Sequence, residues 1–195
     1  ALLYEKFHHG LYESAITEGE EALALYRQEG MWQQILAALN ILAECLGREG
    51  KTEAALACLE ESLSIASQKR NIRGKAIATS HLGVVYFFGS ELEQSRKYFV
   101  QAVDFFQQIN DYGRASATAN NLAWVTLYIG RYEEAKQIAL QSLTWHHQAS
   151  SVLVEEEIFD TLGEITFALR EYDQARAAFI KSSELSERSE RTRYQ

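Results

Sequence analysis

Histidine and cysteine are the side chains of this sequence best suited to bind metal ions or to act as nucleophiles. The histidines include two adjacent pairs, His8-His9 and His146-His147, and His81 stands alone. Adjacent residues diverge by about 100° around a helix, whereas helical metal ligands need spacings of three or four residues. Cys45 and Cys58 lack the paired spacing of a zinc site or a disulfide framework. We therefore expect no metal site, no cofactor, and reduced thiols in a cytoplasmic protein.

Catalytic motifs are missing from the sequence. It contains no glycine-rich phosphate loop, no nucleophile elbow and no HExxH spacing. A catalytic site would have to be assembled from scattered carboxylates such as Glu157 and Asp160, without a lid to exclude water. We therefore predict that the protein is not an enzyme.

Short polar side chains recur every 40 residues, at Asn40, Ser80, Asn120 and Asp160. Amide and hydroxyl groups at regular spacing can donate to and accept from the backbone of an extended peptide. The alternative is that these side chains are only a solvated surface. Positions four and seven or eight residues further on share the same helical face. They add the candidate partner-binding residues Glu44, Arg48, Phe87, Trp124, Tyr128, Glu164 and Phe167.

Aromatic and acidic residues give this face two further properties. Large exposed aromatic rings are typical of interfaces, although core packing is the alternative for Phe87 and Trp124, and packing between helical hairpins is the alternative for Phe88 and Tyr128. The three acidic residues expected on the face would attract a cationic segment of a partner. A solvated acidic helix is the other interpretation. These three residues are Glu157, Asp160 and Glu164.

Composition limits the classes of partner. The 195 residues are 47% hydrophobic and 24% charged, with a formal net charge of −8, which is typical of a soluble globular protein. The basic residues are scattered, so the sequence offers no stripe to neutralise a nucleic acid backbone. No apolar run reaches the roughly 18–20 residues that span a membrane. A clamp for the C-terminal carboxylate of a peptide would need several Lys or Arg side chains, and the candidate face offers only Arg48. We therefore expect a protein or peptide partner that is bound without such a clamp.

A repeat of 40 residues must position these side chains. Its clearest mark is a row of leucines at positions 2, 42, 82, 122 and 162. Each unit holds two amphipathic patterns of about 15–18 residues, separated by breakers such as Gly50-Lys51, Gly89-Ser90 and Gly130-Arg131. We predict ten helices in five antiparallel hairpins and no strand. One hairpin cannot bury its own apolar faces, so the hairpins must stack on their neighbours.

Small residues mark the points where helices cross. Ala43, Gly83, Ala123 and Gly163 follow the row of leucines directly, and large residues such as Phe99 and Phe179 are expected to fill the gaps. The repeats run over about 1–30, 31–70, 71–110, 111–150 and 151–188, in a single domain of residues 1–195. The apolar pattern is already present at Ala1, without an initiator Met, which indicates a piece of a longer protein.

The sequence resembles the tetratricopeptide repeat (TPR) over essentially its whole length. The resemblance is carried by "SHLGVVYFFGSELEQSRKYFVQAV" (80–103) and "NNLAWVTLYIGRYEEAKQIALQSL" (120–143). A period of 40 instead of 34, and no Pro at the repeat ends, depart from the standard form. This longer variant resembles arrays in large bacterial signalling ATPases, in sugar-responsive transcription activators and in kinesin light chains, which hold peptides with a row of asparagines.

The resemblance implies a right-handed α-solenoid of about five TPR-like hairpins, whose first helices line a concave groove. It further implies a protein–protein interaction module of a bacterial regulatory or scaffold protein, with a peptide segment or another domain bound in the groove. The alternative that it leaves open is an effector-sensing domain for a small ligand or a signalling peptide. A sensor needs a closed pocket and an interaction module an open trough. The partner, the parent protein and the oligomeric state are not fixed by these residues.

Overall fold

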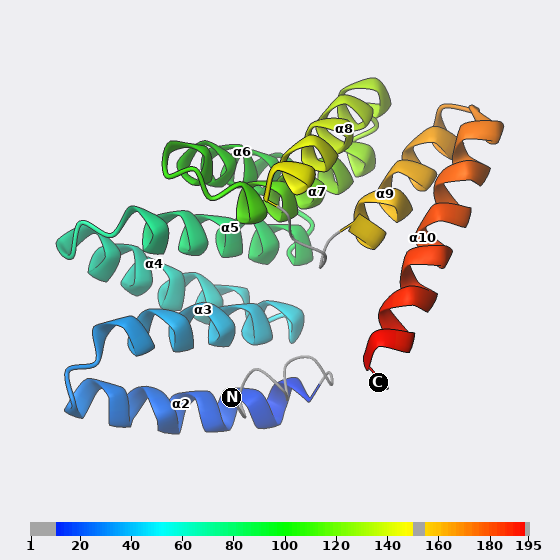
Figure 1. Ribbon diagram of the computed structural model, residues 1–195. Coiled ribbons are helices and arrows are strands. Elements are labelled where there is room, and N and C mark those ends of the chain that lie inside the picture. Colours follow the sequence, from blue (N-terminus) through cyan, green and yellow to red (C-terminus); the bar gives the residue numbers. More distant parts are fainter. Residues whose placement is uncertain (1–10, 150–154, 194–195) are drawn as a thin grey trace. The chain divides into compact units, whose positions relative to one another are not determined.

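The computed structural model describes residues 11–149 and 155–193, and every regular element in these two ranges is an α-helix (Figure 1). The predicted first helix falls on residues 1–10, with Leu2, Leu3 and His8-His9, and lies outside the described residues. The other predicted helices are confirmed. They are α2 (Tyr12–Gln28), α3 (Trp32–Arg48), α4 (Thr52–Gln68), α5 (Ile72–Phe88), α6 (Leu92–Gln108), α7 (Tyr112–Tyr128), α8 (Tyr132–Ala149), α9 (Glu155–Ala168) and α10 (Tyr172–Arg193).

In the described ranges, tight turns with one left-handed residue join successive helices from α2 to α8 and again α9 to α10. At the turn after α3, Gly50 has φ 73°, and the amide of Lys51 donates to the carbonyl of Leu46 at 2.8 Å. This bond satisfies one of the last carbonyls of the helix and reverses the chain. At the predicted breaker Gly89-Ser90 the left-handed residue is Ser90, with φ 61°. Because such turns are short, the two helices of a hairpin, such as α3 and α4 or α7 and α8, lie antiparallel side by side.

The chain divides into two compact units, residues 1–105 and 106–195. In the first unit α3 packs against α2, α4 and α5. Its core is built mainly from aliphatic side chains that point between these helices, including Leu39, Leu42 and Leu59. The amphipathic pattern of each helix supplies this core, since residues three and four apart lie on one face.

Phe99 fills the crossing of α5 and α6. A Cβ atom added to Gly83 would lie 2.7 Å from Cδ1 of Phe99, closer than any side chain tolerates. The hydroxyl of Ser95 donates to the carbonyl of Gly83 at 2.7 Å in the same crossing. In α3 and α4 the same repeat positions hold Ala43 and Leu59, which are both buried in the core of the first unit. A larger residue on one helix therefore faces a smaller one on the other, as the sequence predicts.

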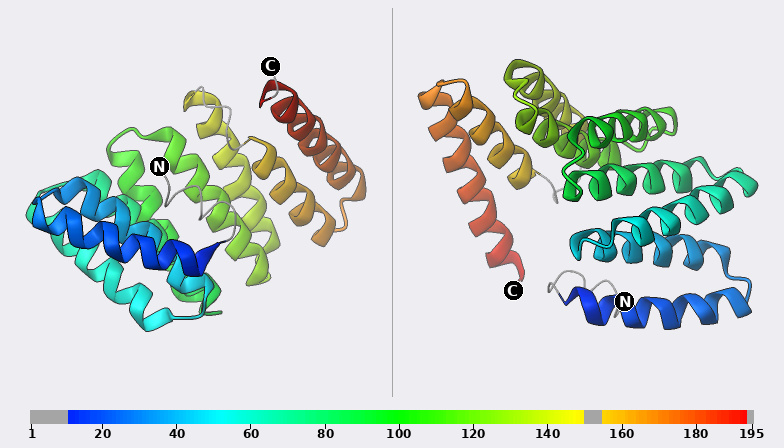
Figure 2. Two further views of the ribbon diagram at one scale, coloured as in Figure 1. Left: turned by 90° about the horizontal axis from the view of Figure 1, so that it is seen from below. Right: turned by 180° about the vertical axis from the view of Figure 1, so that it is seen from behind.

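The second unit contains α7 to α10, and α7 packs against α8 while α9 packs against α10. Both views of Figure 2 show α9 and α10 side by side and antiparallel. Its core is formed by Ala123, Ala135, Ala139, Ile158, Leu162 and Ile165. Gly163 repeats the close approach seen in the first unit, because an added Cβ would lie 2.5 Å from Phe179 Cε1.

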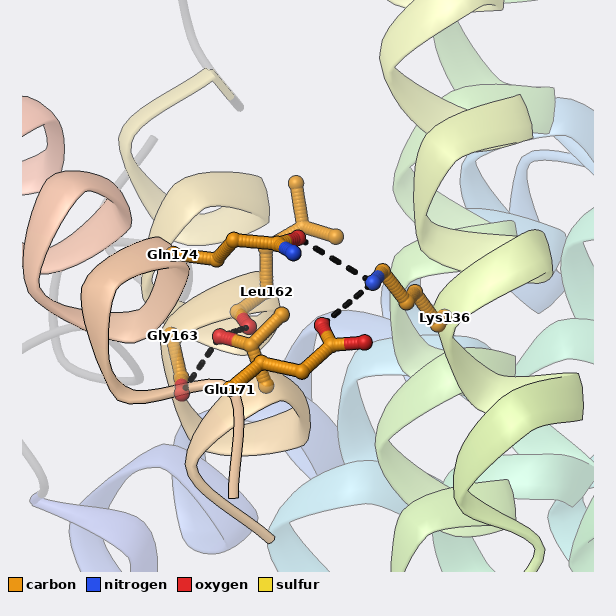
Figure 3. A network of polar contacts seen from close by, with 6 residues as sticks. Lys136, Leu162, Gly163, Glu171 and Gln174 are labelled. Carbon is orange, nitrogen blue, oxygen red and sulfur yellow. Dashed lines mark hydrogen bonds and ion pairs between the residues drawn. The ribbon is translucent and has the colours of Figure 1, made fainter. Parts of the chain in front are cut away.

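Polar bonds join successive hairpins through their second helices. In the second unit the ammonium group of Lys136 on α8 pairs with Glu171 and donates to Gln174 Oε1 at 3.1 Å (Figure 3). In the first unit Arg27 Nη2 on α2 lies 2.6 Å from Glu61 Oε2 on α4. These contacts link the second helix of one hairpin to the next hairpin within the same unit. None of the helices in the described ranges is long and apolar enough to cross a membrane.

Candidate partner-binding surface

The candidate residues lie on the first helices of the hairpins, α3 and α5 in the first unit and α7 and α9 in the second. Asn40 does not lie on an exposed face of α3. It is 4% exposed, and its Oδ1 accepts a hydrogen bond from the hydroxyl of Ser62 on α4 at 2.9 Å. The sequence predicts that Asn40 lies on a face that could bind a peptide backbone, but position 40 lies on the side of α3 that meets α4, so this side chain is committed to its own hairpin.

Asn120 occupies the same position in the fourth repeat but has a different environment. It is 6% exposed, so it is not a solvated side chain. The serine that matches Ser62 is Ser142, whose hydroxyl donates to the carbonyl of Ser116 at 2.8 Å, while the Ser116 hydroxyl donates back to the carbonyl of Ser142 at 2.8 Å. Asn120 Oδ1 consequently has no hydrogen-bond partner within the part of the chain that the structure describes. A buried acceptor without a donor costs about 1–3 kcal/mol and calls for an explanation.

Glu44 and Arg48 form a network with residues of two neighbouring helices. Arg48 Nη2 donates to Glu44 Oε1 at 3.0 Å, and the Arg48 guanidinium lies 4.7 Å from the centre of the Phe88 ring on α5. Glu44 Oε2 lies 3.2 Å from Nδ1 of His81, also on α5. The Arg48 side chain additionally reaches the hydroxyl of Tyr12 at 3.5 Å. Glu44 and Arg48 are therefore committed to contacts within the first unit.

Burial and pairing act in opposite directions on the Glu44 carboxyl. Burial would raise its pKa, but the hydrogen bonds and charges of His81 and Arg48 outweigh burial and hold the pKa below 4.5. The unfolded chain therefore takes up this proton at a higher pH than the folded chain. The stability that the ionised carboxyl contributes is complete above about pH 4.5 and is lost as the pH falls through the lower pKa of the folded state.

Glu44→Gln should accordingly lower the free energy of unfolding by about 1–2 kcal/mol at pH 7, the scale of a charged hydrogen bond. The difference from wild type should shrink as the pH is lowered from 5 to 3. Urea unfolding at each pH measures it, and Glu60→Gln, at an exposed position of α4, serves as the control. A difference that stays constant with pH would contradict the role of this ion pair.

Aromatic residues end the first helices α5 and α7. Phe87 is half-buried and meets Phe88 edge to face, with ring centres 5.8 Å apart. Trp124 is half-buried and meets Tyr128 edge to face at 5.4 Å, and Tyr128 is 57% exposed. Packing between hairpins therefore does not account for the Tyr128 ring. Ser80, which occupies the repeat position of Asn40 and Asn120, is half-buried on α5.

Exposed acidic residues follow one side of α9. Glu157, Asp160 and Glu164 are all exposed. Phe167 continues the same side and is 58% exposed. Partial desolvation and, to a smaller extent, the charge of Glu156 raise the pKa of the Glu157 carboxyl. The α9 helix thus presents carboxylates followed by an exposed aromatic ring.

The histidines of α8 and the cysteine of α3 are further residues of the types that bind a metal ion or act as a nucleophile. His146 is buried, and burial lowers its pKa, with Glu155 acting in the opposite direction. Its Nε2 lies 3.9 Å from Glu155 Oε2, and Nε2 of His147 lies 3.6 Å from Glu155 Oε1. Across the described ranges no group of three metal-binding side chains is arranged to hold an ion. Burial raises the pKa of the Cys45 thiol to about 11, so this thiol is protonated and a poor nucleophile.

Sequence reasoning missed two members of these clusters. His81 was regarded as isolated because its partner Glu44 lies 37 residues earlier, on another helix. Tyr172, which packs edge to face on Phe167 at 5.7 Å, is not among the residues that the sequence indicates for binding. The repeat itself offers a signal for His81, since residues about 40 apart lie on neighbouring first helices, but it offers none for Tyr172, which begins the second helix α10.

Stacked hairpins of two antiparallel helices, repeated every 40 residues, define an all-α solenoid of about five hairpins. Two tetratricopeptide repeat models match the sequence, one over residues 36–69 and one over residues 75–144. The chain therefore belongs to the tetratricopeptide-like repeat proteins.

Solved structures agree with this fold. BtubC (BKLC) from P. vanneervenii has a TM-score of 0.75 and 17% identity, with 97% of this chain and 78% of that chain covered. TPR-like repeats of a Podosopora anserina protein assigned as a kinesin light chain have a TM-score of 0.71 and 15% identity, with coverage of 97% and 93%. A Rap protein in complex with Competence and Sporulation Factor has a TM-score of 0.71 and 15% identity, with coverage of 95% and 62%. Such identities establish the fold alone, and a comparison with curated protein sequences gives no match.

Proposed function

We propose that this chain is a protein-interaction module that binds a peptide segment or a protein domain on the first helices of its hairpins. The supporting observation is the combination on α7 of a buried acceptor without a donor, Asn120 Oδ1, with the half-buried Trp124 and the exposed Tyr128. A partner could donate an N–H group to Asn120 Oδ1 and at the same time remove the Trp124 and Tyr128 rings from water. The tetratricopeptide fold generally serves as a non-catalytic scaffold, which agrees with this assignment.

An effector-sensing role is the second candidate. The observation in its favour is the likeness to the Rap protein, whose structure contains Competence and Sporulation Factor. A bound effector would use the same acceptor and rings on α7. A place within a cytoplasmic bacterial regulator or scaffold belongs to the same proposal and is tested by identifying the partner.

Trp124→Ala should weaken binding by about 2 kcal/mol, because an aromatic anchor at an interface contributes on that scale. Wild type and variant, matched for helicity by circular dichroism, are used to capture partners from a lysate, and the affinity for each captured protein is then measured. An unchanged set of partners with unchanged affinities would remove the α7 surface from the proposal.

The two asparagines provide a matched comparison of binding and stability. Asn40→Ala breaks the bond from Ser62 and should cost about 1 kcal/mol of stability without direct loss of binding. Asn120→Ala removes an acceptor that has no donor, so it should cost less than half as much stability yet weaken binding by about 1 kcal/mol. The same loss of stability in both variants, with binding unaffected, would contradict the role given to Asn120.

A further inference from the structure

Four exposed residues lie along one side of α9 at spacings of three, four and three. We call this set the α9 face. It consists of Glu157, Asp160, Glu164 and Phe167. Such spacing keeps side chains on one face of a helix over three turns. The face therefore offers a continuous row of three carboxylates that ends in an aromatic ring.

The carboxylates of the α9 face have no ion-pair partner among the described residues. No Lys, Arg or His in the described ranges lies within ion-pair distance of Glu157, Asp160 or Glu164. Some carboxylates at other places in the fold do have a cation beside them, as Glu61 has Arg27 and Glu171 has Lys136. A row of like charges on one helix face is unfavourable by itself, and a cationic partner would relieve it.

Exposed aromatic area continues this surface beyond the carboxylates. Phe167 is 58% exposed, and Tyr172, whose ring lies 5.7 Å away edge to face, is 59% exposed. A guanidinium group stacks well on such rings and forms two parallel hydrogen bonds with a carboxylate. The chemistry of the surface thus favours Arg over Lys.

The first unit already contains an arginine held in this way. Glu44 occupies in α3 the repeat position that Glu164 occupies in α9, and it binds the guanidinium of Arg48, which lies over the ring of Phe88. In α9 the position of Arg48 is taken by Ala168, so this helix has no arginine of its own there. Glu44 also meets His81 on the next first helix, which shows that a helix can lie against this position.

The neighbouring first helix carries a further acceptor that has no donor among the described residues. α7 contacts α9, and Asn120 of α7 occupies the repeat position that Asp160 occupies in α9. Asn120 is 6% exposed and its Oδ1 has no donor. Within the part of the second unit that the structure describes, two neighbouring first helices thus carry an acceptor without a donor at this repeat position.

We propose that the α9 face binds an arginine-bearing helical segment of a partner protein. The inference rests on the proposed function, that the chain is an interaction module, and it specifies the class of partner. Arginines repeated every three or four residues on a helix would face the carboxylates one by one, and the arginine at the end would stack on Phe167. The opposite charges would also speed the encounter and make binding sensitive to salt.

Fluorescence anisotropy with a synthetic helical peptide tests the proposal. The labelled probe is an alanine-based helix with four Arg residues at alternating spacings of three and four, and matched peptides carry Lys or Gln at the same positions. We expect the Arg peptide to bind more tightly than the Lys peptide, and the Gln peptide to bind at least tenfold more weakly than the Arg peptide. Raising the salt concentration should weaken the Arg peptide most strongly.

Variants of the chain locate the site. Asp160→Asn and Glu164→Gln should each weaken the Arg peptide about threefold, and Phe167→Ala should weaken it about tenfold. Glu133→Gln, which removes an exposed carboxylate from α8, is the matched control and should leave the affinity unchanged. Circular dichroism confirms that each variant keeps its helicity.

The outcomes separate this inference from the proposed function. Loss of peptide binding in the α9 variants but not in Trp124→Ala supports the inference while counting against the α7 surface. Loss only in Trp124→Ala overturns the inference and leaves the interaction module in place. No measurable binding of the Arg peptide, equal binding of the Gln peptide, or occupation of the face by a second copy in sedimentation experiments would each overturn the inference.

Discussion

Phe99→Ala should lower the free energy of unfolding by about 3–5 kcal/mol, one of the two largest effects that we expect of any single substitution in this protein. Phe99 is 2% exposed, and its ring lies against Gly83, which has no side chain. Truncation leaves a cavity that no neighbouring side chain on the facing helix can fill, so the cost should fall near the upper end of this range. Urea unfolding followed by circular dichroism gives the value.

Two comparisons test the reason for this effect. Phe179→Ala changes the same repeat position next to Gly163, but Phe179 is only partly buried, so it should cost about half as much. Gly83→Ala should destabilise the fold because its Cβ meets the Phe99 ring. Adding Phe99→Leu should recover part of that loss, since the double variant reproduces the pair Ala43 and Leu59. No recovery would contradict the matching of volumes across the crossing.

Ala135→Trp should be as damaging, with a loss of about 3 kcal/mol or more in the free energy of unfolding. Ala135 on α8 is completely buried in the core of the second unit, beside Ala123, Ile158 and Leu162. An indole at this position must push apart two helices that approach closely because both carry small residues there. Thermal melting followed by circular dichroism at 222 nm measures the effect.

Glu133→Trp is the control for the Ala135 experiment. It places the same ring two residues earlier on α8, at an exposed position, and should change the free energy of unfolding by less than about 0.5 kcal/mol. Equal melting temperatures for the two tryptophan variants would mean that the assigned crossing of the helices is incorrect.

Local pattern in the sequence determined the hairpins. The apolar period of each helix, the breakers every 20 residues and the small residues at 43, 83, 123 and 163 are all properties of neighbouring residues. Helix formation, chain reversal and the volume available at a crossing depend on these short-range features. The described helices and the pairing of Gly83 with Phe99 therefore agree with the sequence prediction.

Only the tertiary structure decided which polar groups are committed to the fold. Asn40 and Asn120 are the same residue at the same repeat position, but Ser62 satisfies the first, while Ser116 engages Ser142 and leaves Asn120 Oδ1 without a donor. Which asparagine receives a hydrogen bond depends on residues more than 20 positions apart that meet across helices. Directions matter as well, because neighbouring positions on a helix differ by about 100°. Likewise, that Glu44 is paired and Glu164 is not follows from whether Arg48 or Ala168 stands four residues later and from which helix lies alongside. A periodic sequence places side chains on a face, and the packing of other helices determines which of those side chains remain available to a partner.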